Sequence, residues 1–271
     1  MSRMVWILLA CCAFGQSIAE KTRGMERMEG FFPIYWDAKA GKIWIEISRW
    51  NDEFIYLNSL PAGIGSNDIG LDRGQLGGTR AVRFERSGPK VLLVERNYGF
   101  RATSDNPDER RAVEEAFAQS VVWGGEVAAE DNRRALVDAT SLYLRDAHGV
   151  AARLARAQQG GYKLDLGRSA FYLARTKNFP GNTEVEVTLT FASDDPKGAF
   201  IRSVAASPEA VTVREHHSFV ALPEPGYKPR LFDPRAGYFG ISFMDFAAPI
   251  PKPIRQRYIS RHRTRPGLPI T

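Results

Sequence analysis

The chain has 271 residues, of which 44% are hydrophobic and 25% are charged. This composition supplies a sizeable core, as one large domain or two small ones, and excludes global disorder. The formal net charge is +6, and the surplus gathers toward the C-terminus. We therefore predict a solvated tail or a docking surface there rather than a nucleic-acid interface.

Residues 1–19 are predicted to be a signal peptide. Arg3 is followed by an apolar run from Met4 to Phe14 that is too short to span a bilayer, and Ser17-Ile18-Ala19 matches a cleavage site. A buried N-terminal helix is one alternative, and a lipoprotein anchored through Cys11 is another. Cleavage at Ala19 would remove both cysteines, Cys11 and Cys12, so disulfides and thiolate metal sites are not expected. We expect a periplasmic or secreted protein without a transmembrane span.

Most of the chain reads as β-structure. Residues 20–30 are polar and expected to be mobile, and residues 31–246 are expected to form a β-rich accessory domain, possibly with two subdomains. Residues 61–78 contain six glycines and are expected to form a long loop that is functional or mobile. Alternating or β-branched segments predict strands at residues 42–47, 53–58, 81–86, 90–96, 135–139, 142–144, 170–174, 184–191, 211–214, 218–222 and 238–243.

Two segments have helical patterns. A helix is predicted near 107–122, because Pro107 suits its first turn and Val113, Phe117 and Val121 recur every four residues. A short helix is predicted near 150–158. Strands outnumber helices without a βαβ rhythm, so the fold class is predicted to be α+β and β-rich, with mainly antiparallel sheets. Residues 247–271 are rich in Pro and Arg and are expected to be an extended connector.

The sequence has no recognisable catalytic motif. Its four histidines are His148, His216, His217 and His262, and none has the H-E-x-x-H spacing of a zinc peptidase. His216 and His217 are adjacent, so in a strand they would point to opposite faces, whereas His148 and His262 are expected to be solvated. The serine-nucleophile and phosphate-loop patterns are also missing. We expect no enzyme activity, metal or cofactor on this chain.

Two groups of residues are candidates for binding. Clustered tryptophans can stack on a sugar or peptide, although such residues more often pack a sheet edge. The glycine-rich loop is the second candidate and contributes acidic and basic side chains. The candidate ligand or partner surface therefore comprises Trp36, Trp44, Trp50, Asp68, Asp72 and Arg73, and the candidate docking tail comprises Arg255, Arg257, Arg261 and Arg263.

Several stretches of the sequence together resemble one protein family. The most specific is Trp44–Leu57 followed by Leu60–Gln75, with its run P-A-G-I-G-S-N-D-I-G-L-D-R-G-Q. Residues 28–265 resemble the N-terminal region, a domain of unknown function, of large bacterial exported zinc-dependent metalloproteases. Further matching stretches are residues 117–121, 137–140, 144–150, 182–186, 233–239 and 257–263.

The resemblance implies an accessory role. In that family an H-E-x-x-H catalytic domain follows this region, and zinc is expected only there. This chain stops at Thr271 before any such segment, so no catalytic residue is carried over, and a fragment, a truncated gene product and a stand-alone relative all remain open. The expected function is to dock or shield a catalytic domain. The alternative is an independent extracytoplasmic module that binds peptide or glycan.

Overall fold

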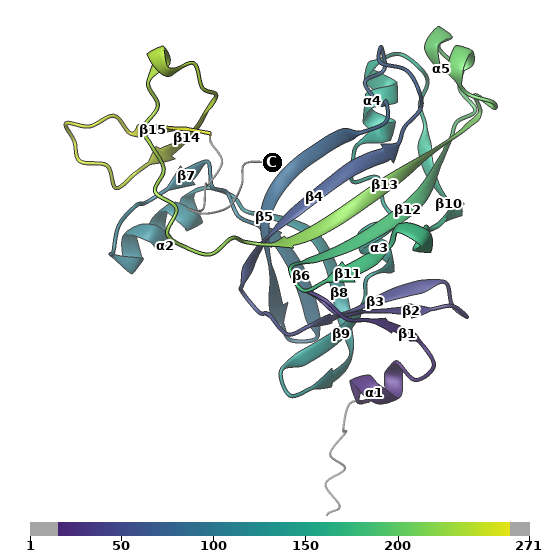
Figure 1. The fold of residues 1–271 in the computed structure, drawn as a ribbon, viewed down its shortest axis with the longest axis horizontal. Helices are drawn as coiled ribbons and strands as arrows, with labels where there is room; N and C mark the ends of the chain where they lie inside the picture. The colour runs from purple at the N-terminus through teal and green to yellow at the C-terminus, as the bar shows by residue number, and fades with distance from the viewer. Residues whose placement is uncertain (1–15, 261–271) are drawn as a thin grey trace, which may run out of the picture.

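The structure is a computed structural model that describes residues 16–260. Its main feature is a twelve-stranded sheet that curls strongly on itself (Figure 1). All pairings within this sheet are antiparallel. The strands are β1 (Glu26–Met28), β2 (Ile34–Asp37), β3 (Lys42–Ile47), β4 (Glu53–Ala62), β5 (Gln75–Ser87), β6 (Lys90–Glu95), β8 (Ser120–Asp131), β9 (Arg134–Asp138), β10 (Lys163–Phe171), β11 (Lys177–Phe179), β12 (Asn182–Ala192) and β13 (Ala210–Ala221). Their order is β1-β2-β3-β9-β8-β6-β5-β4-β13-β12-β10, and β11 also pairs with β12.

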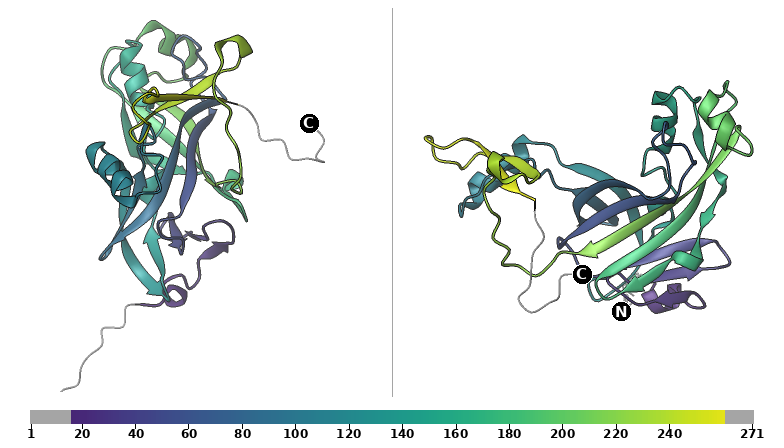
Figure 2. Two further views of the ribbon diagram at one scale, coloured as in Figure 1. Left: turned by 90° about the vertical axis from the view of Figure 1, so that its left-hand side faces the viewer. Right: turned by 45° about the horizontal axis from the view of Figure 1, so that its top comes forward.

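A second, three-stranded sheet stands to one side of the first. It contains β7 (Phe100–Arg101), β14 (Gly240–Asp245) and β15 (Arg255–Ile259), in the order β15-β14-β7. The right-hand view of Figure 2 shows this sheet set apart from the curled sheet. The α2 helix (Pro107–Ala116) lies beside β7, and the rings of Phe100 and Phe117 stack at 3.9 Å.

Helices are few and short. Besides α2, the described residues form α1 (Ile18–Lys21), α3 (Thr140–Tyr143), α4 (Val150–Arg156) and α5 (Ala199–Val204), with 3-10 turns η1 (Leu173–Arg175) and η2 (Pro234–Ala236). No helix among residues 16–260 is long and apolar enough to cross a membrane. The prediction of a β-rich, largely antiparallel fold is confirmed, and so is the short helix near residue 150.

The core lies against one face of the curled sheet. On β12 the alternation predicted from sequence is present, because Val185, Val187 and Leu189 are fully buried in this core. Each such side chain contributes roughly 1.5–3 kcal/mol relative to full exposure. The helices α3 and α4 add Leu142, Tyr143, Val150 and Leu154 to the same core. At its centre, four phenylalanine rings pack mostly edge to face with centroids 5.0–6.1 Å apart: Phe32, Phe54, Phe84 and Phe219.

The helix predicted at 107–122 is too long. It ends at Ala116, because Phe117 adopts an extended backbone (φ −122°, ψ 120°) and stacks on Phe100. Val121 belongs instead to β8, where its side chain is 59% exposed. The four-residue spacing of Val113, Phe117 and Val121 therefore did not mark one helical face. A ring contact distant in sequence ended the helix early.

Other boundaries also differ from the sequence prediction. Residues 142–144 were expected to form a strand, but Leu142 and Tyr143 lie in helix α3. The glycine-rich loop is shorter than 61–78, because β4 continues to Ala62 and β5 begins at Gln75. Residues 20–30 were expected to be mobile but include the second half of α1 and all of β1. The segment from 247 includes β15, which was not predicted. Residues 1–15 of the predicted signal peptide, including Cys11, lie outside the described residues.

Candidate functional site

The three candidate tryptophans do not share one surface. Tyr35 pairs with Trp44 and Trp36 pairs with Ile43 across β2 and β3, so Trp36 and Trp44 point to opposite faces of this ladder. Trp44 is buried in a small cluster with Ile18, whereas Trp36 packs edge to face on Phe171. The indole N–H of Trp50 donates to the carbonyl of Arg133 at 2.7 Å. Each ring therefore packs in a different place.

The glycine-rich loop, residues 63–74, is packed rather than open. Ile64, Ile69 and Leu71 are buried in the main core. Gly63 lies so close to the opposite side of the loop that an added Cβ would be 2.2 Å from the carbonyl oxygen of Leu71. Asp68 is exposed.

Two neighbouring charged residues of this loop differ in their surroundings. Asp72 accepts a hydrogen bond from Gln75 at 2.6 Å. Arg73 lies on the wall of a cleft. Asp72 therefore stabilises the end of the loop, whereas the side chain of Arg73 can contact a ligand in the cleft.

This cleft, which we call the outer cleft, has a volume of about 800 Å³. Its floor is formed by side chains of β12 and β13 that alternate with core residues and so point away from the core. One wall comes from the end of β4 and the loop after it, and the other comes from η1 and β11. The lining residues are Pro61, Ala62, Arg73, Gly74, Ala174, Arg175, Lys177, Phe179, Glu184, Glu186, Arg214 and His216.

A charged network crosses the floor of the outer cleft. His216 Nε2 lies 2.7 Å from Glu184 Oε2, and His216 Nδ1 lies 3.1 Å from Glu186 Oε2. Ionised carboxylates only accept hydrogen bonds, so both ring nitrogens must donate and His216 is an imidazolium. Burial alone would lower the pKa of His216, but its hydrogen bonds to Glu184 and Glu186 and their charges outweigh burial and raise it. Arg214 Nη1 lies 3.4 Å from Glu186 Oε1, which completes the network.

A second polar group is enclosed within the core beneath this floor. Arg145 Nη2 donates to the Tyr56 oxygen at 3.2 Å, so Tyr56 donates its own proton to His217 Nδ1 at 2.8 Å. Burial lowers the pKa of His217 to about 3, and the charges of Arg145 and His216 act in the same direction. His217 is therefore a neutral core residue, on the face opposite to His216 as predicted.

Glu215 lies beside His217 in this enclosed group. Its Oε1 is 3.8 Å from His217 Nε2, and neither of its oxygens has a hydrogen-bond partner among the described residues. Burial raises the pKa of Glu215 to about 8, and the charge of Asp146 adds to this. The backbone N–H groups of Ala147 and His148 face the carboxyl group and oppose the shift without reaching good hydrogen-bond geometry.

His148 was expected to be solvated, but it is buried. Asn58 Nδ2 donates to His148 Nδ1 at 3.1 Å, which replaces the water that an exposed ring would bind. Burial lowers the pKa of His148, and the charge of Arg153 acts in the same direction. His262 lies outside the described residues. Within residues 16–260, no group of three or more His, Cys, Asp or Glu side chains is placed to hold a metal ion.

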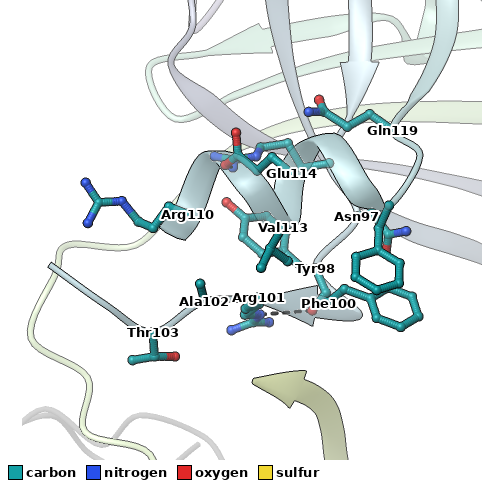
Figure 3. Close-up of a pocket in the computed structure, with 12 residues that line it drawn as sticks. Asn97, Tyr98, Phe100, Arg101, Ala102, Thr103, Arg110, Val113, Glu114 and Gln119 are labelled. Atoms are coloured by element: carbon teal, nitrogen blue, oxygen red, sulfur yellow. Dashed lines mark hydrogen bonds and ion pairs between the residues drawn. The ribbon is translucent and has the colours of Figure 1, made fainter. Parts of the chain in front are cut away.

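A smaller cavity of about 280 Å³ lies between α2 and β7 (Figure 3). Its charged side chains are engaged with each other or with the backbone. Arg96 pairs with Glu53 at 3.1 Å and also with Glu114, and Arg101 Nε donates to the carbonyl of Tyr98 at 2.9 Å. This cavity therefore marks the junction where the small sheet attaches to the rest of the protein.

The small sheet and the segments around it expose many apolar side chains, which we call the C-terminal surface. Nine of the fifteen exposed large hydrophobic residues in the described chain lie between residues 222 and 254. Phe239 is the most exposed of the aromatic rings, at 91%. This concentration of exposed apolar side chains in one segment makes it a candidate interaction site. The surface comprises Leu222, Tyr227, Leu231, Tyr238, Phe239, Ile241, Phe246, Ile250 and Ile254.

Basic side chains are interspersed along the segment that carries the C-terminal surface. Residues 222–260 contain six lysines and arginines against three acidic residues. Among the described residues, Lys252 and Arg255 have no acidic partner, while Arg257 stacks over the ring of Phe232 at 3.5 Å. The candidate docking tail therefore begins inside strand β15 with Arg255 and Arg257, and Arg261 and Arg263 lie outside the described residues.

Sequence reasoning did not identify the outer cleft. The alternation of β12 did place Glu184 and Glu186 on one face, and the same reasoning places Arg214 and His216 on one face of β13. Nothing in the sequence showed that these two faces adjoin in the sheet, where Glu186 pairs with His216. Of the candidate residues, only Arg73 lines this cleft.

Comparison with known proteins identifies one family. The sequence model described as "Domain of unknown function (DUF5117)" matches residues 74–267. No curated protein and no solved structure matches the chain. The matched segment includes most of the curled sheet, the floor of the outer cleft and the whole C-terminal surface. The chain therefore belongs to the family of the domain of unknown function DUF5117.

Proposed function

We propose that this chain is a non-catalytic docking domain that binds the catalytic domain of an exported zinc metallopeptidase through the C-terminal surface. The observation that carries the proposal is the concentration of exposed apolar side chains between residues 222 and 254. The predicted signal peptide supports a periplasmic or secreted location. The metallopeptidase partner comes from the family resemblance of the sequence.

The charge of the C-terminal surface restricts the kind of protein surface that it can bind. Lysine and arginine side chains interspersed with exposed apolar ones favour a partner surface that carries both apolar side chains and carboxylates. The alternative of a glycan-binding module has less support, because Trp36 and Trp44 point to opposite faces of the sheet. We therefore favour a folded, acidic protein surface as the occupant.

The test is a binding measurement with a defined partner. A reading frame beside this gene that encodes an H-E-x-x-H protein should give a product that forms a complex with this chain in isothermal titration calorimetry. Burying one large side chain such as Phe239 contributes roughly 1.5–3 kcal/mol, so Phe239→Ala should weaken binding about ten- to a hundredfold.

A matched pair of leucines provides the control. Leu231 and Leu76 are 67% and 68% exposed, but only Leu231 lies on the C-terminal surface. Leu231→Ser should weaken the complex and Leu76→Ser should not. The proposal fails if the two proteins do not associate, or if both leucine variants bind like the unmodified chain.

A further inference from the structure

The outer cleft carries positive charge that its own ion pairs do not neutralise. On the floor, the two carboxylates of Glu184 and Glu186 balance the imidazolium of His216 and the guanidinium of Arg214. Three more cations line the cleft, and none of them has an ion pair within residues 16–260: Arg73, Arg175 and Lys177. The cleft therefore has about three unpaired positive charges, which favour an anionic ligand.

These cations lie on both walls of the outer cleft. Arg73 follows β4, while Arg175 and Lys177 lie at η1 and β11, and strands β13 and β12 run between the two walls. Three strand spacings of about 4.8 Å place the walls about 14 Å apart at the level of the backbone. To bind a single small anion, Arg73 on one wall and a cation on the other wall would both have to turn inward, at a cost in side-chain rotamer entropy. Anionic groups held well apart match the cleft better.

The walls of the outer cleft also have an apolar component. Pro61 and Ala62 lie on the β4 side, and the ring of Phe179 on the β11 side is 48% exposed. A phosphate site would need several hydrogen-bond donors that converge on one point. In the outer cleft the cations are separated, and apolar side chains lie on the same walls. This combination fits a chain that carries both carboxylates and aliphatic side chains.

We propose that the outer cleft binds an extended acidic peptide segment, with carboxylates reaching Arg73 on one wall and Lys177 on the other. Phe179 contacts an apolar side chain of the peptide between them. The network of Glu184, Glu186, His216 and Arg214 keeps the floor charge-balanced, so the peptide lies over it without repulsion. This inference does not rest on docking through the C-terminal surface, because it uses other residues and another face.

A short labelled peptide tests the proposal. In fluorescein-labelled Glu-Leu-Glu-Leu-Glu the outer glutamates are about 14 Å apart when the chain is extended. The peptide should bind the full chain in fluorescence anisotropy at low ionic strength, and its Gln-Leu-Gln-Leu-Gln counterpart should not. The double variant Arg73→Ala/Lys177→Ala should weaken binding at least tenfold.

The control variant also removes two positive charges, but from positions outside the outer cleft. Lys39 and Lys90 are exposed at hairpin turns away from the cleft, so Lys39→Ala/Lys90→Ala should change the affinity by less than twofold. Equal losses in the two double variants would overturn the proposal, because binding would then follow net charge. So would equal binding of the glutamine peptide, full displacement by an equal concentration of pyrophosphate, or no binding at millimolar peptide.

Discussion

The buried carboxyl group of Glu215 should make the stability of the protein fall above neutral pH. Its side chain is 0% exposed, and burial together with the charge of Asp146 raises its pKa from 4.5 to about 8. The folded protein therefore keeps the proton up to about pH 8, whereas the unfolded chain releases it near pH 4.5. Stabilisation by this group is complete below pH 4.5 and is lost as the pH rises through 8.

The change in the free energy of unfolding follows from the difference between the pKa values of Glu215 in the folded and unfolded protein. Each pH unit within this window changes the free energy of unfolding by up to about 1.4 kcal/mol. His217 acts in the opposite direction, because its pKa is lowered from 6.5 to about 3 and its contribution is lost as the pH falls below 6.5. The two effects offset each other between about pH 4.5 and 6.5. Between pH 6.5 and 8, Glu215 alone should cost on the order of 2 kcal/mol.

The substitution Glu215→Gln tests this reasoning, because a glutamine stays neutral at all these pH values. Urea unfolding, followed by tryptophan fluorescence at pH 6.5, 7.0, 7.5 and 8.0, gives the free energy of unfolding for both proteins. The advantage of Glu215→Gln over the unmodified protein should grow by about 2 kcal/mol over this range. The pKa of His216 is raised in both proteins by its hydrogen bonds to Glu184 and Glu186, so its contribution cancels in the difference.

The matched control is Glu126→Gln, at an exposed position of β8. Its difference from the unmodified protein should not depend on pH. If the difference for Glu215→Gln is also constant from pH 6.5 to 8, then Glu215 is already ionised in the folded protein, for example as an ion pair with a protonated His217. That result would refute the neutral pair that we infer from their burial.

Three further predictions concern other parts of the protein. The imidazole of His216 should titrate above pH 6.5 and that of His217 far below it when both are followed by NMR; equal midpoints would contradict the opposite environments of the two rings. Gly63→Ala should lower the free energy of unfolding by about 1–3 kcal/mol, because its Cβ would be 2.2 Å from a backbone oxygen, while Gly181→Ala, with open space around it, should be nearly neutral. Tyr56→Phe should cost about 1–3 kcal/mol in urea unfolding, because it removes the donor to His217 Nδ1; an unchanged midpoint would show that this hydrogen bond contributes nothing.

Local patterns in the sequence were enough to predict much of the sheet. The alternation from Glu184 to Phe191 set the buried face of β12, and the gap between the strands predicted at 81–86 and 90–96 placed the turn between β5 and β6. These predictions succeed because residues two apart in a strand share a face whatever the strand pairs with. The antiparallel fold class follows from the same short-range signals.

Features that depend on distant contacts could not be predicted in this way. At the end of α2, Phe117 stacks on Phe100, and the buried His148 accepts a hydrogen bond from Asn58, 90 residues away. The outer cleft depends on the pairing of β13 with both β12 and β4, and the paired residues of β4 and β13 are more than 150 positions apart in the sequence. A single sequence shows the faces of strands but not which faces adjoin.

The two proposed binding surfaces should act independently. No residue lines both the outer cleft and the C-terminal surface. A separate cavity, lined by Ile55, Ala81 and Ile241, lies where the small sheet approaches the outer face of β4 and β5. Substitutions at distant sites without shared partners usually have additive effects. Phe239→Ala should therefore leave the affinity for the acidic peptide unchanged, and Arg73→Ala/Lys177→Ala should leave docking unchanged.

A departure from additivity would have a specific structural meaning. If the acidic peptide weakens docking, or if either substitution changes both affinities, the small sheet must move relative to the curled sheet when one surface is occupied. Such a movement would change the shape of the cavity beside Ile241, because this cavity is lined by residues of both sheets. By thermodynamic linkage, the factor by which the peptide changes docking must equal the factor by which docking changes peptide affinity. Titrating the acidic peptide with and without the docking partner, and the docking partner with and without the peptide, therefore shows whether the two sites are independent or coupled.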